Sequence, residues 1–232
     1  MISPHHQCIF VHIPKCGGQS IETAFLDQLG LTWEQRGALL LSPNVNPRKG
    51  PPRLAHLSFQ EYLDLGYLSE SEFRDYFSFT IVRNPFRRIE SLYGFLGYDC
   101  AMRFSDFIQG PLSAKVSRSS LRQNYFFRPQ VEFLKGHSGE IEVDRVLKLE
   151  EPERILECLS KFGIHELPHH NRRQHRKGLR HFLCRTKHLC MGQFSWSLRV
   201  DPAIRWKPED IKKVTQLFWE DFELLGYSKI PP

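Results

Sequence analysis

Residues 8–29 read CIFVHIPKCGGQSIETAFLDQL, and this stretch decides the fold class. Cys8–Ile13 is short, apolar and ended by Pro14, which is typical of a buried strand. Ser20–Leu29 carries its apolar residues on one stripe and stops at Gly30, which predicts a helix. A strand joined to a helix through a glycine turn is how α/β domains begin, so the sequence predicts an α/β fold.

Strands and helices continue to alternate along the chain. We expect further strands at Arg53–Leu57, Phe77–Val82 and Val143–Leu149, with a proline-rich loop at Ser42–Arg53. Four signals mark helix starts: Ser58 with Glu61 three positions on, Asn84 with Pro85 (to about Leu96), Pro152 (to about Phe162) and Pro208 (to Leu225, before Gly226). The alternation predicts a three-layer sandwich with a central, mostly parallel sheet.

The composition is that of an ordinary globular protein. Of 232 residues, 41% are hydrophobic and 25% are charged, which excludes disorder and suits one domain over residues 1–232. The apolar runs are too short to span a bilayer. Six irregularly spaced Cys and no signal-peptide pattern predict a cytoplasmic location, unless the chain is a catalytic domain trimmed from a secretory-pathway protein.

The turn between the first strand and the first helix has the chemistry of a phosphate-binding loop. Open α/β sheets place ligands at the carboxyl ends of strands. The glycines let backbone N–H groups approach a ligand, the helix N-terminus adds partial positive charge, and a lysine adds a full charge. The expected cradle consists of Lys15, Cys16, Gly17, Gly18, Gln19 and Ser20. The lysine precedes the glycines, unlike in the nucleoside-triphosphate P-loop; a plain glycine turn is the alternative.

A second anion-binding pattern, IVRNPFRRIESLYGF, follows at residues 81–95. Arg83 lies at the carboxyl end of a predicted strand, and Ser91 lies about two helical turns beyond it. A strand-end Arg with a helical Ser can hold a second phosphate, because guanidinium binds phosphate through two hydrogen bonds. The alternative is that Arg83 pairs with a structural acid. For Arg87 and Arg88 we expect exposed helix positions.

These two motifs together resemble those of sulfotransferases that use 3′-phosphoadenosine-5′-phosphosulfate (PAPS). HIPKCGGQSI is similar to their 5′-phosphosulfate loop, and IVRNPFRRIESLY to their 3′-phosphate motif. LAHLSFQEYLDLGY resembles the segment of heparan sulfate 2-O-sulfotransferases and related small carbohydrate sulfotransferases that carries the catalytic His, here His56. FWEDFELLGY resembles the closing helix of the family. Clear resemblance covers roughly residues 8–100 and 208–227.

The resemblance implies a P-loop-NTPase-like sulfotransferase fold and a role for each motif. His56 is the expected general base, and Lys15 the residue that stabilises the leaving phosphate. By the same resemblance, Arg83 and Ser91 are expected to bind the 3′-phosphate. At Gln19 the family usually has a small hydroxyl residue, so only the backbone N–H is expected to bind there. PAPS is the implied co-substrate, PAP the product, and no metal is implied.

The positive charge of the chain lies in one divergent segment, residues 165–190. It holds seven Lys and Arg against Glu166, and so carries the whole net charge of +6. Three roles stay open: a loop that closes on the nucleotide through Arg176 and Lys177, a lining that attracts an acidic acceptor, or a solvated surface loop. Cys184, His188 and Cys190 do not have the spacing of a zinc site.

Two other function classes remain as alternatives. One is a P-loop-like nucleotide kinase or phosphotransferase, which the position of the lysine argues against. The other is a nucleic-acid-binding protein that uses the basic segment, which leaves both phosphate motifs unexplained. For the sulfotransferase, the expected acceptor is a free hydroxyl, on a carbohydrate and possibly on an acidic glycan. The sequence leaves the oligomeric state open, and also whether Cys16 packs or oxidises.

Overall fold

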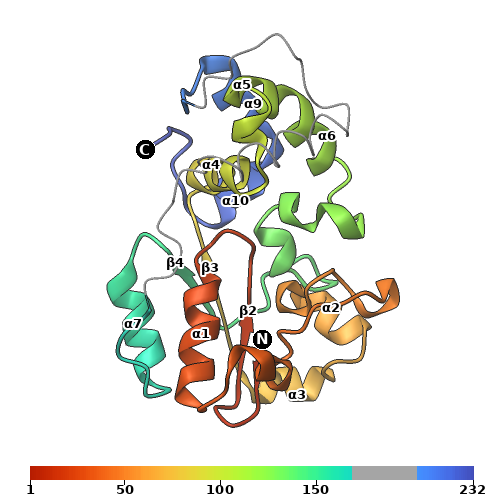
Figure 1. Ribbon diagram of the computed structural model, residues 1–232, viewed down its shortest axis with the longest axis vertical. Helices are drawn as coiled ribbons and strands as arrows, with labels where there is room; N and C mark the ends of the chain where they lie inside the picture. Colours follow the sequence, from red (N-terminus) through yellow and green to blue (C-terminus); the bar gives the residue numbers. More distant parts are fainter. Residues whose placement is uncertain (169–202) are drawn as a thin grey trace. The chain divides into compact units, whose positions relative to one another are not determined.

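The computed structural model describes residues 1–168 and 203–232 (Figure 1). The chain divides into two compact units. Unit 1 comprises Met1–Asn84 and Ser119–His170, and unit 2 comprises Pro85–Arg118 and Asn171–Pro232. Most of the basic segment, with Arg176 and Lys177, lies outside the described residues, and so does CRTKHLC at 184–190.

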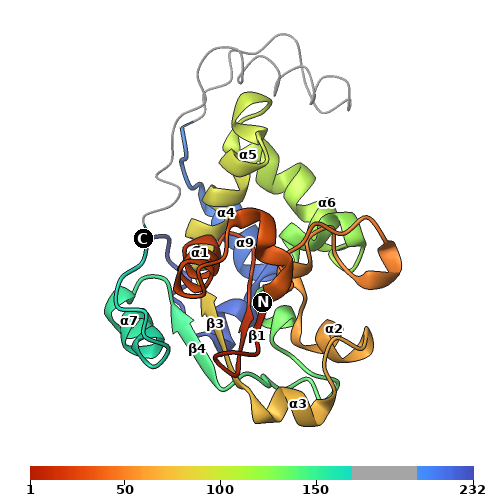
Figure 2. The same cartoon turned by 60° about the horizontal axis from the view of Figure 1, so that its bottom comes forward.

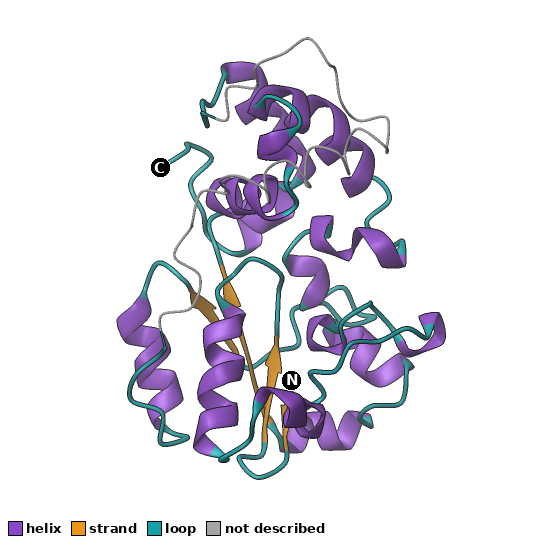
Figure 3. Cartoon of the chain, viewed as in Figure 1, coloured by secondary structure: helices purple, strands orange, loops and turns teal. Residues whose placement is uncertain are grey.

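Unit 1 is built on a four-stranded sheet, drawn in orange in Figure 3. Its strands are β1 (Ile2–Ser3), β2 (Cys8–Val11), β3 (Phe77–Val82) and β4 (Arg145–Lys148), in the order β1-β2-β3-β4. β2, β3 and β4 run parallel, and β1 pairs antiparallel with β2. The predicted α/β fold with a mostly parallel central sheet is confirmed. The sequence analysis missed β1, since two residues are too short for an alternation pattern.

Aromatic side chains join this sheet to two helices. Phe10 and Phe79 are register partners with ring centroids 5.0 Å apart. Phe25, from α1 (Gly18–Gln28), lies 6.4 Å from the Phe79 ring. Phe162, just after α7 (Pro152–Ser160), contacts both Phe25 and Phe79. The end of α7 and the middle of α1 therefore meet on one face of the sheet, and Figure 2 shows α7 beside β4.

The remaining elements of unit 1 are short. They are the 3₁₀ turns η1 (Trp33–Leu39), η2 (Pro47–Lys49), η3 (Leu54–His56), η6 (Arg122–Phe127) and η7 (Val131–Phe133), and the helices α2 (Phe59–Asp64) and α3 (Glu70–Asp75). The predicted capping box of Ser58 and Glu61 is present at α2. The predicted strand Arg53–Leu57 is wrong, because it forms η3 and keeps only one bridge, from Arg53 to Pro43. The prolines just before it lack the N–H that a ladder needs.

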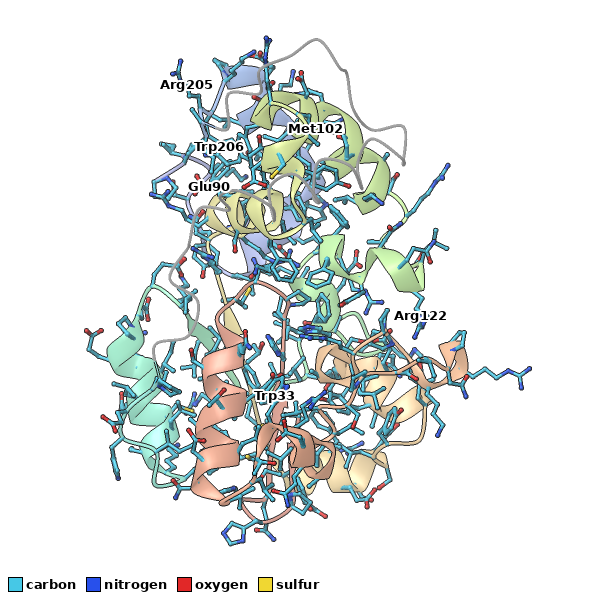
Figure 4. The ribbon with its side chains drawn as sticks, viewed as in Figure 1. Trp33, Glu90, Met102, Arg122, Arg205 and Trp206 are labelled. Atoms are coloured by element: carbon cyan, nitrogen blue, oxygen red, sulfur yellow. The ribbon has the colours of Figure 1, made fainter. Side chains whose placement is uncertain are left out.

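Unit 2 is helical. It contains α4 (Pro85–Phe95), α5 (Phe104–Phe107), α6 (Ser113–Val116), α9 (Pro208–Leu217) and α10 (Trp219–Leu224), with the turns η4 (Tyr98–Cys100) and η5 (Ile108–Leu112). Phe86 of α4 contacts Trp206 at 4.8 Å and Phe222 at 5.1 Å between ring centroids. Trp206 also donates its indole N–H to Glu90 over 3.0 Å, and both are labelled in Figure 4.

Two predictions for this unit need correction. The last helix was expected to run unbroken from Pro208 to Leu225, but it divides at Phe218, whose φ of −120° and ψ of 31° are not helical. Arg88 was expected on an exposed face and is 1% exposed, because α4 also buries its neighbours Phe86 and Ile89. No helix among the described residues is long and apolar enough to cross a membrane.

Candidate active site

The loop between β2 and α1 gives the N-terminus of α1 the features of an anion-binding end. Gly17 occupies the N-cap position with a φ of 82°, in the left-handed region, and has no side chain with which to cap the helix. The first turn of α1 contains no acidic residue. Since the first N–H groups of a helix have no partner within it, this end favours a negatively charged ligand. Lys15, half-buried, has a φ of 71°, an unusual conformation for a residue with a side chain.

Both glycines of the loop are also required by packing. A Cβ on Gly18 would lie 2.3 Å from Cδ2 of His12, and a Cβ on Gly17 would lie 2.7 Å from Cδ1 of Leu149. These close contacts support the alternative interpretation, in which the glycines are present because the turn leaves no room for a side chain. It does not exclude ligand binding, because the same close packing fixes the backbone at the head of α1.

His12, which follows β2, makes a buried hydrogen bond with Glu22 of α1. Nδ1 of His12 is 2.5 Å from Oε1 of Glu22, and both residues are buried. Burial acts to raise the pKa of Glu22, but the charge of His12 and its hydrogen bond outweigh burial and lower that pKa. Glu22 therefore stays ionised and fixes the orientation of the His12 ring.

His56 lies at the carboxyl end of β2, although it comes from η3. Its Nδ1 donates a hydrogen bond to the backbone carbonyl of His12 over 2.9 Å, and the two rings are 4.4 Å apart. Burial and the charge of His12 lower the pKa of His56 well below its usual 6.5. His56 is therefore neutral at neutral pH, and because Nδ1 carries the proton, Nε2 carries the lone pair. Nε2 makes no hydrogen bond with the described part of the chain.

Arg83 follows β3 and reaches the same loop. It is half-buried, and its Nη1 donates to the carbonyl oxygen of Lys15 over 3.4 Å. The side-chain amide of Gln130 binds the backbone of Arg83 on both sides: it accepts from the Arg83 N–H and donates to the Arg83 carbonyl, each over 2.8 Å. The alternative, that Arg83 pairs with a structural acid, finds no support among the described residues, where this side chain forms no ion pair.

The structure thus brings three of the predicted residues to one edge of the sheet: Lys15, His56 and Arg83. The neighbouring Cys16 is 1% exposed, Gln19 is exposed and Ser20 is half-buried. Ser91 is half-buried in α4 of unit 2. Arg176 and Lys177 lie outside the described residues. Within the described residues, no group of three or more His, Cys, Asp or Glu side chains could hold a metal ion.

Sequence reasoning missed two partners in this site. Gln130 is 47 residues from Arg83 and belongs to no motif, so no signal in the sequence points to it. Glu22 is ten residues from His12. Its position on the apolar stripe side of the first helix was a usable signal, because a carboxylate facing the core needs a charged partner.

A comparison with family models identifies the family of the chain. The model of the sulfotransferase family matches residues 1–228. The chain belongs to the sulfotransferase family. It is thereby assigned to sulfuryl transfer. Neither the curated proteins nor the solved structures that were compared gave a match.

Gly18→Ala tests the close packing of the loop. The added Cβ would overlap the His12 ring, so we expect the free energy of unfolding to fall by about 1–3 kcal/mol in urea titrations. Gly110→Ala is the control, because a Cβ there meets nothing within 4 Å. A Gly18→Ala protein as stable as wild type would show that the ring and the loop move apart freely.

His56→Asn tests the buried, neutral state of His56. Asn keeps a donor for the His12 carbonyl but does not titrate. Since the pKa of His56 is lowered from 6.5 in the folded protein, the unfolded chain binds a proton that the folded chain does not as pH falls below 6.5. Between about pH 7.5 and about pH 5.5, wild type should therefore lose about 1 kcal/mol more unfolding free energy than the variant.

The measurement is urea unfolding at several pH values in that range. Glu22 does not interfere, because its lowered pKa affects stability only as pH falls below its unfolded value of 4.5. Equal pH dependence of wild type and His56→Asn would contradict a buried, neutral His56.

Proposed function

We propose that this sulfotransferase moves a sulfuryl group from PAPS to a carbohydrate hydroxyl, with His56 as general base. One observation carries the proposal: Lys15, His56 and Arg83 meet where β2 and β3 end, through the bonds of His56 to the His12 carbonyl and of Arg83 to the Lys15 carbonyl. Sulfuryl transfer from a phosphate needs an anion-binding site, a cation and a neutral base close together, and this edge of the sheet offers a helix N-terminus, Lys15 and His56.

The donor would be held by the residues that its two phosphates require. The backbone of Lys15–Ser20 and the Lys15 ammonium suit the 5′-phosphosulfate, and the glycines leave no side chain between the backbone and the donor. Arg83 suits the 3′-phosphate, since guanidinium binds phosphate in two-point fashion. Ser91, Arg176 and Lys177 are proposed as further 3′-phosphate contacts from the sequence alone.

In the proposed reaction, the acceptor oxygen attacks sulfur while the bond from sulfur to the phosphate oxygen breaks. The hydroxyl proton passes to Nε2 of His56, and the electron pair of the broken bond stays on the phosphate of PAP. Lys15 stabilises the charge that develops on this leaving group. His56 suits the role of base because its proton is already placed on Nδ1, bound to the His12 carbonyl, so Nε2 is the atom that accepts.

The surroundings of His56 favour a sugar as acceptor. The rings of Tyr125 and Phe126 lie 5.4 Å and 5.9 Å from His56, and flat aromatic faces pack well against sugar rings. Burial raises the pKa of Tyr125 to about 12, while the nearby charges of Arg53 and Arg122 act against this rise.

Those two arginines favour an acceptor that carries negative charge. Arg53 is exposed and forms no ion pair within the described residues. The guanidinium of Arg122 donates hydrogen bonds to the backbone carbonyls of Asn44 (2.5 Å) and Gly50 (3.0 Å). These bonds connect η6 to the proline-rich loop (Figure 4). Among the described residues, no acidic side chain forms an ion pair with Arg122. An acidic glycan is the acceptor that these charges suit best.

The choice of donor is tested by thermal shift with three ligands. We expect PAP to raise the unfolding temperature in a concentration-dependent way, and ATP with Mg²⁺ to leave it unchanged, because stabilisation follows binding to the folded state. Stabilisation by ATP instead of PAP would support a nucleotide kinase. Salt-sensitive binding of a DNA or RNA oligonucleotide, with no response to PAP, would support the nucleic-acid alternative.

The role of His56 is tested by radiolabel transfer from PAPS to a panel of glycans. His56→Asn should lower turnover by about 100-fold or more, because a positioned base contributes that much, and should leave PAP affinity within a few-fold. His137→Asn is the matched control, since His137 is a largely exposed residue of unit 1. Full turnover in His56→Asn would remove the residue from the role of base.

A further inference from the structure

We propose that Gln130 is a positioning residue, which holds Arg83 against the donor loop so that its guanidinium can bind the 3′-phosphate; this rests on the proposed function. The residue lies directly before η7, far from both phosphate motifs in sequence, and its side chain is fully buried. A buried amide needs partners, and the hydrogen bonds described below join Gln130 to residues of both motifs.

The first contact is a pair of hydrogen bonds to one residue. Oε1 of Gln130 accepts from the Arg83 N–H, and Nε2 donates to the Arg83 carbonyl, each over 2.8 Å. The β3–β4 pairing ends one residue earlier, at Val82 and Lys148. The Gln130 amide therefore supplies the two backbone hydrogen bonds that a neighbouring strand would otherwise make with Arg83, one residue beyond the end of β3. Both bonds are to backbone atoms, so they fix the direction in which the Arg83 side chain leaves the chain.

The second contact joins this clamp to the donor loop. Sγ of Cys16 lies 3.2 Å from the same Oε1 of Gln130 and donates to it. Nη1 of Arg83 in turn donates to the carbonyl of Lys15, the residue before Cys16. The hydrogen bonds form a closed ring that runs from Gln130 to Arg83, to the Lys15–Cys16 peptide and back. Gln130 thus sets the end of β3 and the loop after β2 relative to each other.

This arrangement explains why Cys16 and Gln130 are buried beside the site although neither has a role in the proposed reaction. Cys16 is 1% exposed, so its thiol serves as a hydrogen-bond donor to Gln130, while its backbone N–H remains part of the proposed phosphate cradle. Gln130 itself touches neither proposed phosphate position; it acts through Arg83. Because small misplacements of binding groups cost much affinity, loosening this clamp should weaken the 3′-phosphate contact selectively.

Gln130→Met tests the inference, because Met has a similar length and packs well but binds neither Arg83 nor Cys16. The measurement is calorimetric binding of PAP and of AMP, which lacks the 3′-phosphate. We expect the preference of wild type for PAP over AMP to shrink about tenfold in Gln130→Met. A merely structural role would lower the unfolding temperature and leave this preference unchanged.

Thr80→Val is the matched control. Thr80 is fully buried in β3 and donates its hydroxyl to the Val11 carbonyl over 2.7 Å, so the variant also removes a buried hydrogen bond between β2 and β3. It should be destabilised, yet it should keep the PAP preference of wild type. If Gln130→Met keeps that preference too, the positioning role of Gln130 is overturned while the proposed function stands.

Two further results decide the remaining cases. A wild-type protein with no preference for PAP over AMP would overturn the donor assignment and the inference with it. Should Gln130→Met not fold, Gln130→Glu carries the test: it keeps the size and the acceptor for the Arg83 N–H, but loses the donor to the Arg83 carbonyl. A reduced PAP preference in Gln130→Glu supports the clamp, and an unchanged preference overturns it.

Discussion

The parallel pairing of β2 with β3 is the constraint on which the rest of unit 1 depends. Because Val11 pairs with Thr80, both strands end at the same edge of the sheet, and the chain segments that follow them leave side by side. One segment is the glycine loop with Lys15, and the other begins with Arg83. An antiparallel pairing would send them to opposite edges. The hydroxyl of Thr80, bonded to the Val11 carbonyl, reinforces this register at the last pair.

At this edge of the sheet, two polar side chains form hydrogen bonds with backbone N–H and carbonyl groups that lie just beyond the strand ends. His56 binds the carbonyl of His12, one residue after β2, and Gln130 binds the N–H and carbonyl of Arg83, one residue after β3. A strand end leaves such groups without ladder partners, and burial makes their satisfaction obligatory. The need to satisfy these backbone groups thus also places His56 and Arg83 beside the glycine loop.

The parts of this arrangement that are local in sequence could be predicted. The strand, glycine turn and helix at residues 8–29 and the strand at Phe77–Val82 follow from patterns of apolar residues, and Lys15 and Arg83 follow from their positions at strand ends. Gln130 could not be predicted, because its contacts join residues far apart and its type carries no pattern. Arg53–Leu57 was misjudged for the opposite reason: its local composition suits a strand, but the prolines before it cannot pair, so His56 comes from a 3₁₀ turn.

The burial of His56 has a consequence for the proposed chemistry. Desolvation lowers its pKa, which keeps Nε2 unprotonated but also makes it a weak base. Binding of an anionic donor at the neighbouring loop adds negative charge near the ring, and an opposite charge favours the protonated form. The basicity of His56 would therefore rise when the donor is bound and fall when PAP leaves. The hydrogen bond of His12 to Glu22 holds the ring that lies 4.4 Å from His56, so in the proposed reaction the occupancy of the donor loop would control how readily His56 takes up a proton.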